Sequence, residues 1–553
     1  MSSNPIPGSP SWKVRLWCGL TLIAIGVGAL LLGWSSPQRG LTRAGPVDAV
    51  DPGAHDLRDI RAHNSPSVVR SPLNSNLLAV VNRIDTPRFG CSMHVSDDDG
   101  RTWHETVLPL PAGAEPKCFA PDAAFSADGT LYVSFVTLAG VANSPDAVWL
   151  TSSSDGGQSL STPTRLLGRY AFQVRLAADP MVPRRLYLAW LQAAEIGTLS
   201  FAQPGNPINI IRSDDGGATW TDPLRVSAPD RTRVIAPTLA LNGEGQVYVA
   251  FLDLGEDSLD YAGGHEGRGG PAYGGPWRLV VARSVDGGRT WAEASVDSAL
   301  VPYTRLVVFT PPAPSLVARG PNVYVAFADA RLDDADVWLW ASHDGGISWA
   351  PPVRVNDNPK GDGTSQYLPG LALTSRGRLD LVYYDRRGDR ADVINTVSLQ
   401  SSYDHGRTFS KTLSISGRGF DSRIGIGSER DMPDLGSRLA VSSTSSGAIA
   451  LWSDTRAGTQ ASNKQDIGRA RLEMPAGSAR AAWSWPLRIM GTTLALMGIA
   501  VFFAPVPDLG ALRRERRSRP VLLLEVAAML FVLVILAVIA VSAASSFTRS
   551  GGP

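Results

Sequence analysis

A short turn motif recurs six times in this 553-residue chain and constrains its fold more than any other feature. In the clearest copy, the residues from Ser284 to Trp291 read S-V-D-G-G-R-T-W. Such a sequence builds a tight turn, because the aspartate side chain bonds nearby backbone amides and a glycine adopts a positive φ. We expect the terminal aromatic side chain to pack in the groove between two neighbouring sheets.

The copies of this turn follow one another at intervals of 57 to 71 residues. Five copies end in Trp or Phe, and a weaker copy that starts at Ser153 has Leu160 in that place. We expect all six turns to be structural. Their aspartates are Asp98, Asp155, Asp215, Asp286, Asp344 and Asp404.

A second repeat alternates with the first and has the pattern of a β-hairpin. Clear copies begin at Ala236 (APTLALNGEGQVYVAF) and Ala313 (APSLVARGPNVYVAF), and the hairpins that begin at Ser65, Val174 and Gly436 are degenerate copies. Seven hairpins occur, each with apolar alternation or a short apolar run around a turn. Six are followed by a strand, the turn motif and a fourth strand, which predicts four-stranded units.

The seventh unit is incomplete in the sequence. Its hairpin is followed by one strand, from Gln465 to Met474, and by no turn motif. We expect residues around Pro46 to Val50 to supply the missing strand, because this pairing would remove an exposed sheet edge.

The turn motif resembles the Asp-box repeat of sialidase-like β-propellers, and the resemblance covers roughly residues 60 to 473. It implies an all-β propeller, which we assign to residues 61–473. Typical sialidases of this class have six blades. The seven hairpins of this chain predict seven four-stranded blades, with six as the alternative.

Three apolar runs predict transmembrane helices, one N-terminal and two C-terminal, at residues 15–35, 487–506 and 521–544. Lys13 and Arg15 lie at the start of the first run, and five arginines lie between 513 and 519. By the positive-inside rule, residues 1–14 and the basic loop 507–520 are cytoplasmic. The linkers 36–60 and 474–486, the propeller and the tail 545–553 are then extracytoplasmic. We therefore expect a multi-pass protein of the plasma membrane, with the lipid bilayer as a partner.

The charge balance, the spacing of the histidines and the cysteines indicate which partners, metal sites and disulfides to expect. Lys and Arg number 52 against 51 Asp and Glu, which argues against a nucleic-acid partner. The seven histidines show no metal-binding spacing, so we expect neither a metal nor a cofactor. Cys91 and Cys118 are either a disulfide or two buried thiols. A relaxed disulfide there would contribute about 3–4 kcal/mol.

Aspartate and arginine recur just after the second strand of several hairpins. A ring of these side chains at one rim is a candidate binding site for an anionic sugar, since guanidinium matches a carboxylate bidentately. In the alternative interpretation, each Asp caps its turn and each Arg pairs with a neighbouring blade, and the repetition favours this structural role. The D-x-R spacing also places a rim arginine close to its own aspartate. The candidate residues are Arg83, Asp253, Asp329, Arg331, Asp385, Arg387, Asp454 and Arg456.

The catalytic pattern implied by the sialidase resemblance is not found. That family uses three arginines on the substrate carboxylate, a Tyr nucleophile activated by Glu, and an Asp acid/base. This chain has no R-I-P motif and no assignable Tyr–Glu pair, although Tyr367, Tyr383 and Tyr384 lie on predicted strands. We expect a recognition or assembly module for a protein or glycan partner. The alternative is a surface sialidase-like glycoside hydrolase or lyase that acts on acidic sugars.

Overall fold

The computed structural model describes residues 20–25, 43–50, 59–141, 143–193, 206–257, 273–303, 312–426, 435–474, 490 and 492–497. Residues Leu41–Gly477 form one compact unit, and Met1–Gly40 with Ser478–Pro553 form a second. Within the described ranges, no helix is long and apolar enough to cross a bilayer. Residues 20–25 and 492–497, inside two of the predicted spans, are helical. The third predicted span, the basic loop and both predicted terminal segments lie outside the described residues.

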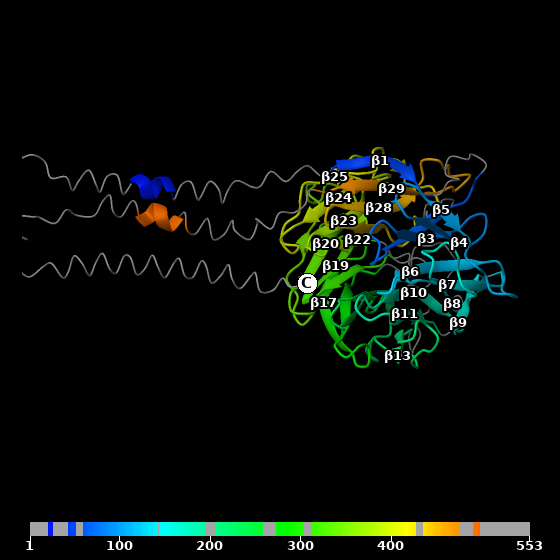
Figure 1. Cartoon of the computed structure of the whole chain (residues 1–553). Helices are drawn as coiled ribbons and strands as arrows, with labels where there is room; N and C mark the ends of the chain where they lie inside the picture. The colour runs from blue at the N-terminus through cyan, green and yellow to red at the C-terminus, as the bar shows by residue number, and fades with distance from the viewer. Residues whose placement is uncertain are drawn as a thin grey trace, which may run out of the picture. The chain divides into compact units, whose positions relative to one another are not determined.

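The larger unit is an all-β propeller with seven blades (Figure 1). Each blade is an antiparallel sheet of four strands, and one blade has a short additional strand. The seven-bladed prediction is therefore confirmed, and the six-bladed alternative is wrong.

Strands are numbered in chain order. In the first six blades the four main strands run in this order from the innermost to the outermost, and in the seventh the outermost strand is β1. The first blade contains β2 (His63–Arg70), β3 (Leu78–Ile84), β4 (Gly90–Ser96) and β5 (His104–Thr106). The second contains β6 (Cys118–Phe125), β7 (Leu131–Ala139), β8 (Ser144–Ser153) and β9 (Thr164–Leu167). The third contains β10 (Ala171–Ala178), β11 (Leu186–Gln192), β12 (Ile208–Ser213) and β13 (Leu224–Arg225). The fourth contains β14 (Val234–Leu241), β15 (Val247–Asp253), β16 (Trp277–Ser284) and β17 (Ala292–Leu300).

The last three blades follow the same order. The fifth contains β18 (Ser315–Arg319), β19 (Asn322–Asp329), β20 (Asp336–Ser342) and β21 (Val353–Arg354). The sixth contains β22 (Gln366–Leu373), β23 (Leu379–Asp385), β24 (Ile394–Ser402), β25 (Leu413–Ser414) and the additional β26 (Phe420–Asp421). The seventh contains β27 (Ala440–Ser443), β28 (Gly447–Asp454), β29 (Asp466–Glu473) and, as its outer strand, β1 (Arg43–Ala49).

The two ends of the propeller chain meet in the seventh blade. Strand β1 pairs antiparallel with β29, in a register that runs from Arg43 opposite Glu473 to Ala49 opposite Gly468. A hydrogen bond of 2.8 Å from Arg469 Nη2 to Asp48 Oδ2 supports this pairing. The prediction that the N-terminal linker completes the last sheet is confirmed, and the strand begins slightly earlier than expected.

Hydrophobic side chains hold the blades against one another. The second strand of each blade is a nearly continuous apolar run, as in β15, whose seven residues are all buried. This pattern fits a strand that is covered on both faces, here by the two neighbouring blades. Trp190, Trp277, Trp340 and Trp452 are fully buried in these layers.

The Asp boxes form the expected turns. Asp286 Oδ1 accepts hydrogen bonds of 2.9 Å from the amides of Arg289 and Thr290, and Ser284 Oγ accepts one of 2.8 Å from the Gly288 amide. Gly288 has a φ of 88°, which a residue with a Cβ rarely adopts. Trp291 packs against the core cluster that joins the third, fourth and fifth blades.

The weak Asp-box copy also folds as a turn. The Asp155 carboxylate accepts a hydrogen bond of 3.0 Å from the Ser159 amide. Leu160 packs against the core cluster between the first and second blades, where the other copies place an aromatic ring.

Strand register gives the propeller two distinct rims. In the first blade, the start of the inner strand lies opposite the end of the second strand, with His63 beside Ile84. The Asp box follows Ser96, which lies opposite Leu78 at the other end of the second strand. We call the first edge the pocket rim, for the site described below, and the second the Asp-box rim.

Candidate functional site

A small pocket lies on the propeller axis at the pocket rim. Residues from six blades line it, and most stand at the start of an inner strand. Its cavity volume is about 30 Å³, enough for a water molecule or an anionic group of similar size. The lining residues are Ser65, Arg83, Phe119, Ala120, Pro121, Gln173, Val174, Arg175, Ala236, Ala313, Ser437 and Arg438.

A repeated backbone irregularity shapes this pocket. In five blades the inner strand has a β-bulge close to its start, as between Asn64 and Ser67 in β2. Each bulge contains a residue other than glycine with a positive φ, a strained conformation that clusters at functional sites. These residues are Ser65, Ala120, Gln173, Ala236 and Leu368, with φ between 48° and 58°. Four of the five line the pocket.

Arg83 enters the pocket from the end of β3 and is buried with its own carboxylate partner. Its Nη2 donates a 2.7 Å hydrogen bond to Asp85 Oδ2, and both side chains are almost completely inaccessible. The guanidinium carbon lies 5.0 Å from the centre of the Phe119 ring, within range of a cation–π contact. Asp85 and the Phe119 ring therefore both hold the Arg83 guanidinium in place.

Arg438 reaches the pocket from the start of the seventh blade. Its Nε donates to the Pro66 carbonyl at 3.1 Å, and its Nη2 donates to the Pro121 carbonyl at 2.7 Å. Burial lowers the pKa of Arg438; Asp122, at 3.7 Å, opposes this effect, and nearby Arg83 adds to it. The site therefore holds two cations whose mutual repulsion is only partly compensated.

Arg175 is the third arginine of the pocket and has the most hydrogen-bonding capacity to spare. Its Nε donates to the Pro237 carbonyl at 3.2 Å. Among the residues that the structure describes, none accepts a hydrogen bond from its terminal nitrogens, and no carboxylate lies within 4.0 Å of it. Three guanidiniums thus face two carboxylates, those of Asp85 and Asp122.

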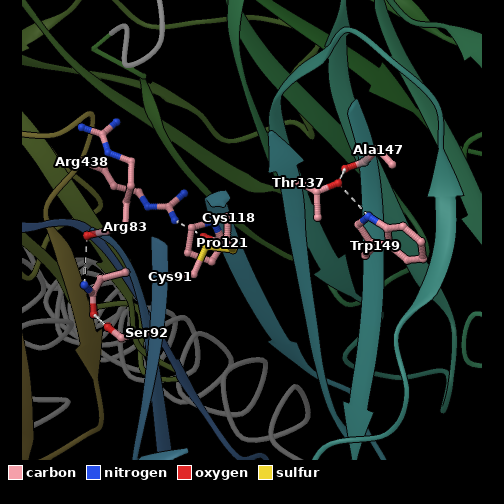
Figure 2. Close-up of a disulfide and its surroundings, with 10 residues drawn as sticks. Arg83, Cys91, Ser92, Cys118, Pro121, Thr137, Ala147, Trp149 and Arg438 are labelled. Atoms are coloured by element: carbon pink, nitrogen blue, oxygen red, sulfur yellow. Dashed lines mark hydrogen bonds between the residues drawn. A yellow bond between two sulfur atoms is a disulfide. The ribbon is translucent and has the colours of Figure 1, made fainter. Parts of the chain in front are cut away.

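A disulfide lies close to the pocket residues Arg83 and Pro121 (Figure 2). Cys91 in β4 is bonded to Cys118 in β6, with a Cα–Cα distance of 5.5 Å, so the bond joins the first two blades. Cys91 lies directly opposite Arg83 in the β3–β4 register, and Cys118 precedes Phe119. Of the two alternatives left open by the sequence, the structure contains the disulfide.

The predicted ring of aspartates and arginines consists mainly of local ion pairs outside the pocket. Arg331 Nε donates to Asp329 at 2.8 Å and Arg387 Nε donates to Asp385 at 2.7 Å. Arg456 Nε similarly contacts Asp454 at 2.9 Å, and Asp253 accepts a 3.1 Å bond from Arg278. Of the eight predicted residues, Arg83 alone is among the pocket lining that the structure describes. This arrangement agrees with the structural interpretation of the repeat.

Further carboxylates neutralise two of these rim arginines. Arg331 Nη2 donates to Asp297 at 2.9 Å, and Arg387 Nη1 donates to Asp357 at 2.6 Å. A guanidinium already engaged by two carboxylates offers little attraction to a third.

The described lining of the pocket contains no Asp, Glu, His or Tyr side chain. Tyr367, one of the three tyrosines on predicted strands, is buried and bonded to Asn395, and burial raises its pKa. Burial likewise raises the pKa values of Tyr383 and Tyr384. Within the described residues, no group of three or more His, Cys, Asp or Glu side chains is arranged to hold a metal ion. The three arginines of the lining can bind an anion.

Sequence reasoning missed two of the three pocket arginines. Arg175 and Arg438 belong to the hairpins that begin at Val174 and Gly436, which the repeat pattern presents as degenerate copies. A signal was present, because in both copies an arginine stands at the position that Thr238, Ser315, Gly370 and Asp122 occupy in the regular copies. Departures from the repeat therefore mark the functional candidates.

No protein-family model matches the chain, and no curated protein matches it. Among solved structures, it is similar to a protein of unknown function from Dyadobacter fermentans, with 13% identity over 78% of this chain and 99% of that one and a TM-score of 0.44. It is also similar to the Hadza microbial sialidase Hz136, with 14% identity, coverage of 72% and 74%, and a TM-score of 0.41. The NanB sialidase of Streptococcus pneumoniae gives 11% identity, coverage of 78% and 71%, and a TM-score of 0.41. Similarity at this level carries no argument about activity.

Proposed function

We propose that this chain is a membrane-anchored recognition module, whose propeller binds a carboxylate group of a protein or glycan partner in the axial pocket without hydrolysing it. One observation carries the proposal. Three guanidiniums from three blades, those of Arg83, Arg175 and Arg438, surround a pocket whose described lining has no acid, base or tyrosine nucleophile.

The charge balance of the pocket favours one negative charge. Asp85 and Asp122 offset two of the three guanidiniums, which leaves a surplus positive charge in a partly buried site. A carboxylate placed there would reduce the repulsion between Arg83 and Arg438 and would accept hydrogen bonds from Arg175. Charge-assisted pairs of this kind are roughly twice as strong as neutral hydrogen bonds.

The size and the walls of the pocket bear on which chemical group of a ligand can enter it. A volume of about 30 Å³ is large enough for a carboxylate group. Phe119, Pro121 and Val174 give the walls an apolar character. We therefore infer that the ligand inserts only its acidic group and that its body remains above the pocket rim.

The membrane part of the proposal rests on the three apolar runs and on the arginine-rich loop at 507–520. The disulfide between Cys91 and Cys118 adds support, because such bonds persist in oxidising compartments. Both observations favour an extracytoplasmic propeller.

Calorimetric titration of the detergent-solubilised full chain tests the binding function. N-acetylneuraminate, glucuronate and an acidic peptide should bind, and neutral N-acetylglucosamine should not. Arg175→Gln should weaken binding about tenfold, equivalent to the loss of roughly 1.4 kcal/mol. Arg289→Gln, at an exposed position of an Asp box, is the matched control and should bind normally. Absence of binding by all carboxylates would refute the proposal, and turnover of an acidic glycan would favour the hydrolase or lyase alternative.

A further inference from the structure

Both connections of the propeller to the rest of the chain leave from the Asp-box rim. Arg43, the first residue of β1, lies opposite Glu473, the last residue of β29. Glu473 also lies opposite Gly447, which follows the turn between β27 and β28 at that rim. Arg471, two residues before the end of β29, donates a 2.8 Å hydrogen bond to Asp99 Oδ2 in the first Asp box.

The sequence between these points and the predicted spans is short. Seven residues, 36–42, separate the first predicted span from β1, and thirteen, 474–486, separate β29 from the second. A fully extended chain of seven residues covers about 25 Å. Strand β1 is itself seven residues long, or about 23 Å. To turn the pocket rim toward the bilayer, the first linker would have to run fully extended along the whole height of the propeller.

We propose that the Asp-box rim is the face of the propeller that lies against the lipid bilayer, and that the axial pocket opens away from it. This inference rests on the membrane anchoring proposed above. The two tethers attach to neighbouring strands of a single blade, so they fix which rim faces the lipid. The pocket is then presented to partners in the extracytoplasmic space rather than to lipid headgroups.

Exposed apolar side chains occur on both rims. The orientation is therefore inferred from the rim at which the two linkers leave the propeller, and not from hydrophobicity. Val285 and Ile347 are exposed within Asp boxes on the Asp-box rim. Val141 and Ile394 are exposed next to the turns between the second and third strands, on the pocket rim. These four positions form a matched set for labelling.

Energy transfer to the membrane surface tests the orientation. Full-length chain carrying Cys18→Ser, with the disulfide retained, is given one cysteine at a time: Val285→Cys, Ile347→Cys, Val141→Cys or Ile394→Cys. Each variant is labelled with a fluorophore and reconstituted into phosphatidylcholine–phosphatidylglycerol vesicles that contain rhodamine-labelled lipid. Because the rims lie about 25 Å apart, transfer from the two Asp-box positions should be at least about twofold more efficient than from the other two.

Alkaline carbonate extraction of the same vesicles separates this inference from the anchoring on which it rests. Protein that remains in the membrane, with greater transfer from Val285→Cys and Ile347→Cys, supports the orientation. Retained protein with equal transfer from both rims, or with greater transfer from Val141→Cys and Ile394→Cys, overturns the orientation and leaves the anchoring intact. Protein released by carbonate overturns both.

Discussion

Arg438 in the seventh blade donates a 2.7 Å hydrogen bond to the carbonyl oxygen of Pro121 in the second blade. The same guanidinium bonds the Pro66 carbonyl in the first blade, so one side chain links three blades at the axis. Arg438 thus has a structural task as well as a place in the pocket lining.

Arg438→Met should therefore destabilise the propeller. The change leaves backbone carbonyls at the axis without their donor, and we expect the free energy of unfolding to fall by about 1.5–3 kcal/mol. Urea denaturation followed by tryptophan fluorescence measures this. Arg175→Met is the control, because Arg175 donates to one carbonyl, and it should lose much less. Equal losses in the two variants would contradict the linking role of Arg438.

The first Asp box should make a pH-dependent contribution to stability. Partial burial raises the pKa of Asp98, but hydrogen bonds from Thr102, Ser96 and the Arg101 amide outweigh it and hold this pKa at about 2. The folded pKa lies below the unfolded value of about 3.9. The contribution is then fully present above about pH 4 and is lost as the pH falls through 2.

Asp98→Asn tests this expectation. The variant should melt at a lower temperature than the parent at pH 7, and the difference should shrink as the pH falls from 4 toward 2. Asp97→Asn, at the exposed neighbouring position, should melt like the parent throughout. A difference in melting temperature that does not change with pH would show that the carboxylate charge is not responsible.

The disulfide should stabilise both the fold and the pocket. Closure of a loop with a sequence separation of 27 residues is worth about 3–4 kcal/mol, so Cys91→Ser with Cys118→Ser should lower the free energy of unfolding by that amount. Affinity for carboxylates should fall too, because Cys91 lies opposite Arg83 and Cys118 precedes Phe119, and both of these neighbours line the pocket. Denaturation and calorimetry with and without dithiothreitol provide the test. The double variant should be insensitive to the reductant, and a parent protein equally insensitive would argue against the bond.

We expect no hydrolysis of a fluorogenic sialoside by the full chain. The described pocket lining offers no acid or base, and burial raises the pKa of Tyr367, which disfavours an activated phenolate. A fluorescence assay at pH 5 to 8 measures this. Turnover that disappears in Arg387→Ala or Arg456→Ala, with the melting temperature unchanged, would place catalysis at these arginines, outside the axial pocket. That result would refute the recognition proposal.

Much of the propeller could be predicted because its determinants are local and repeated. The Asp box at Ser284 and the hairpin at Ala236 each fit within about twenty residues, so their period shows the blade. The pairing of Asp385 with Arg387 is also local and was foreseen as the structural alternative. The pocket was not predicted, because Arg438 and Pro121 lie far apart in the sequence and meet only when the ring of blades closes.

The pairing of Arg43 with Glu473 has a consequence for biosynthesis. The ribosome makes β1 first and its partner β29 last, so the strand that completes the seventh blade has to wait, unpaired, until the other six blades have been synthesised. If the first apolar segment is held in the membrane during this interval, the waiting strand stays close to the site where β29 emerges. Attachment of this segment to the membrane then limits the time during which the unpaired edge of β29 is available to a neighbouring nascent chain.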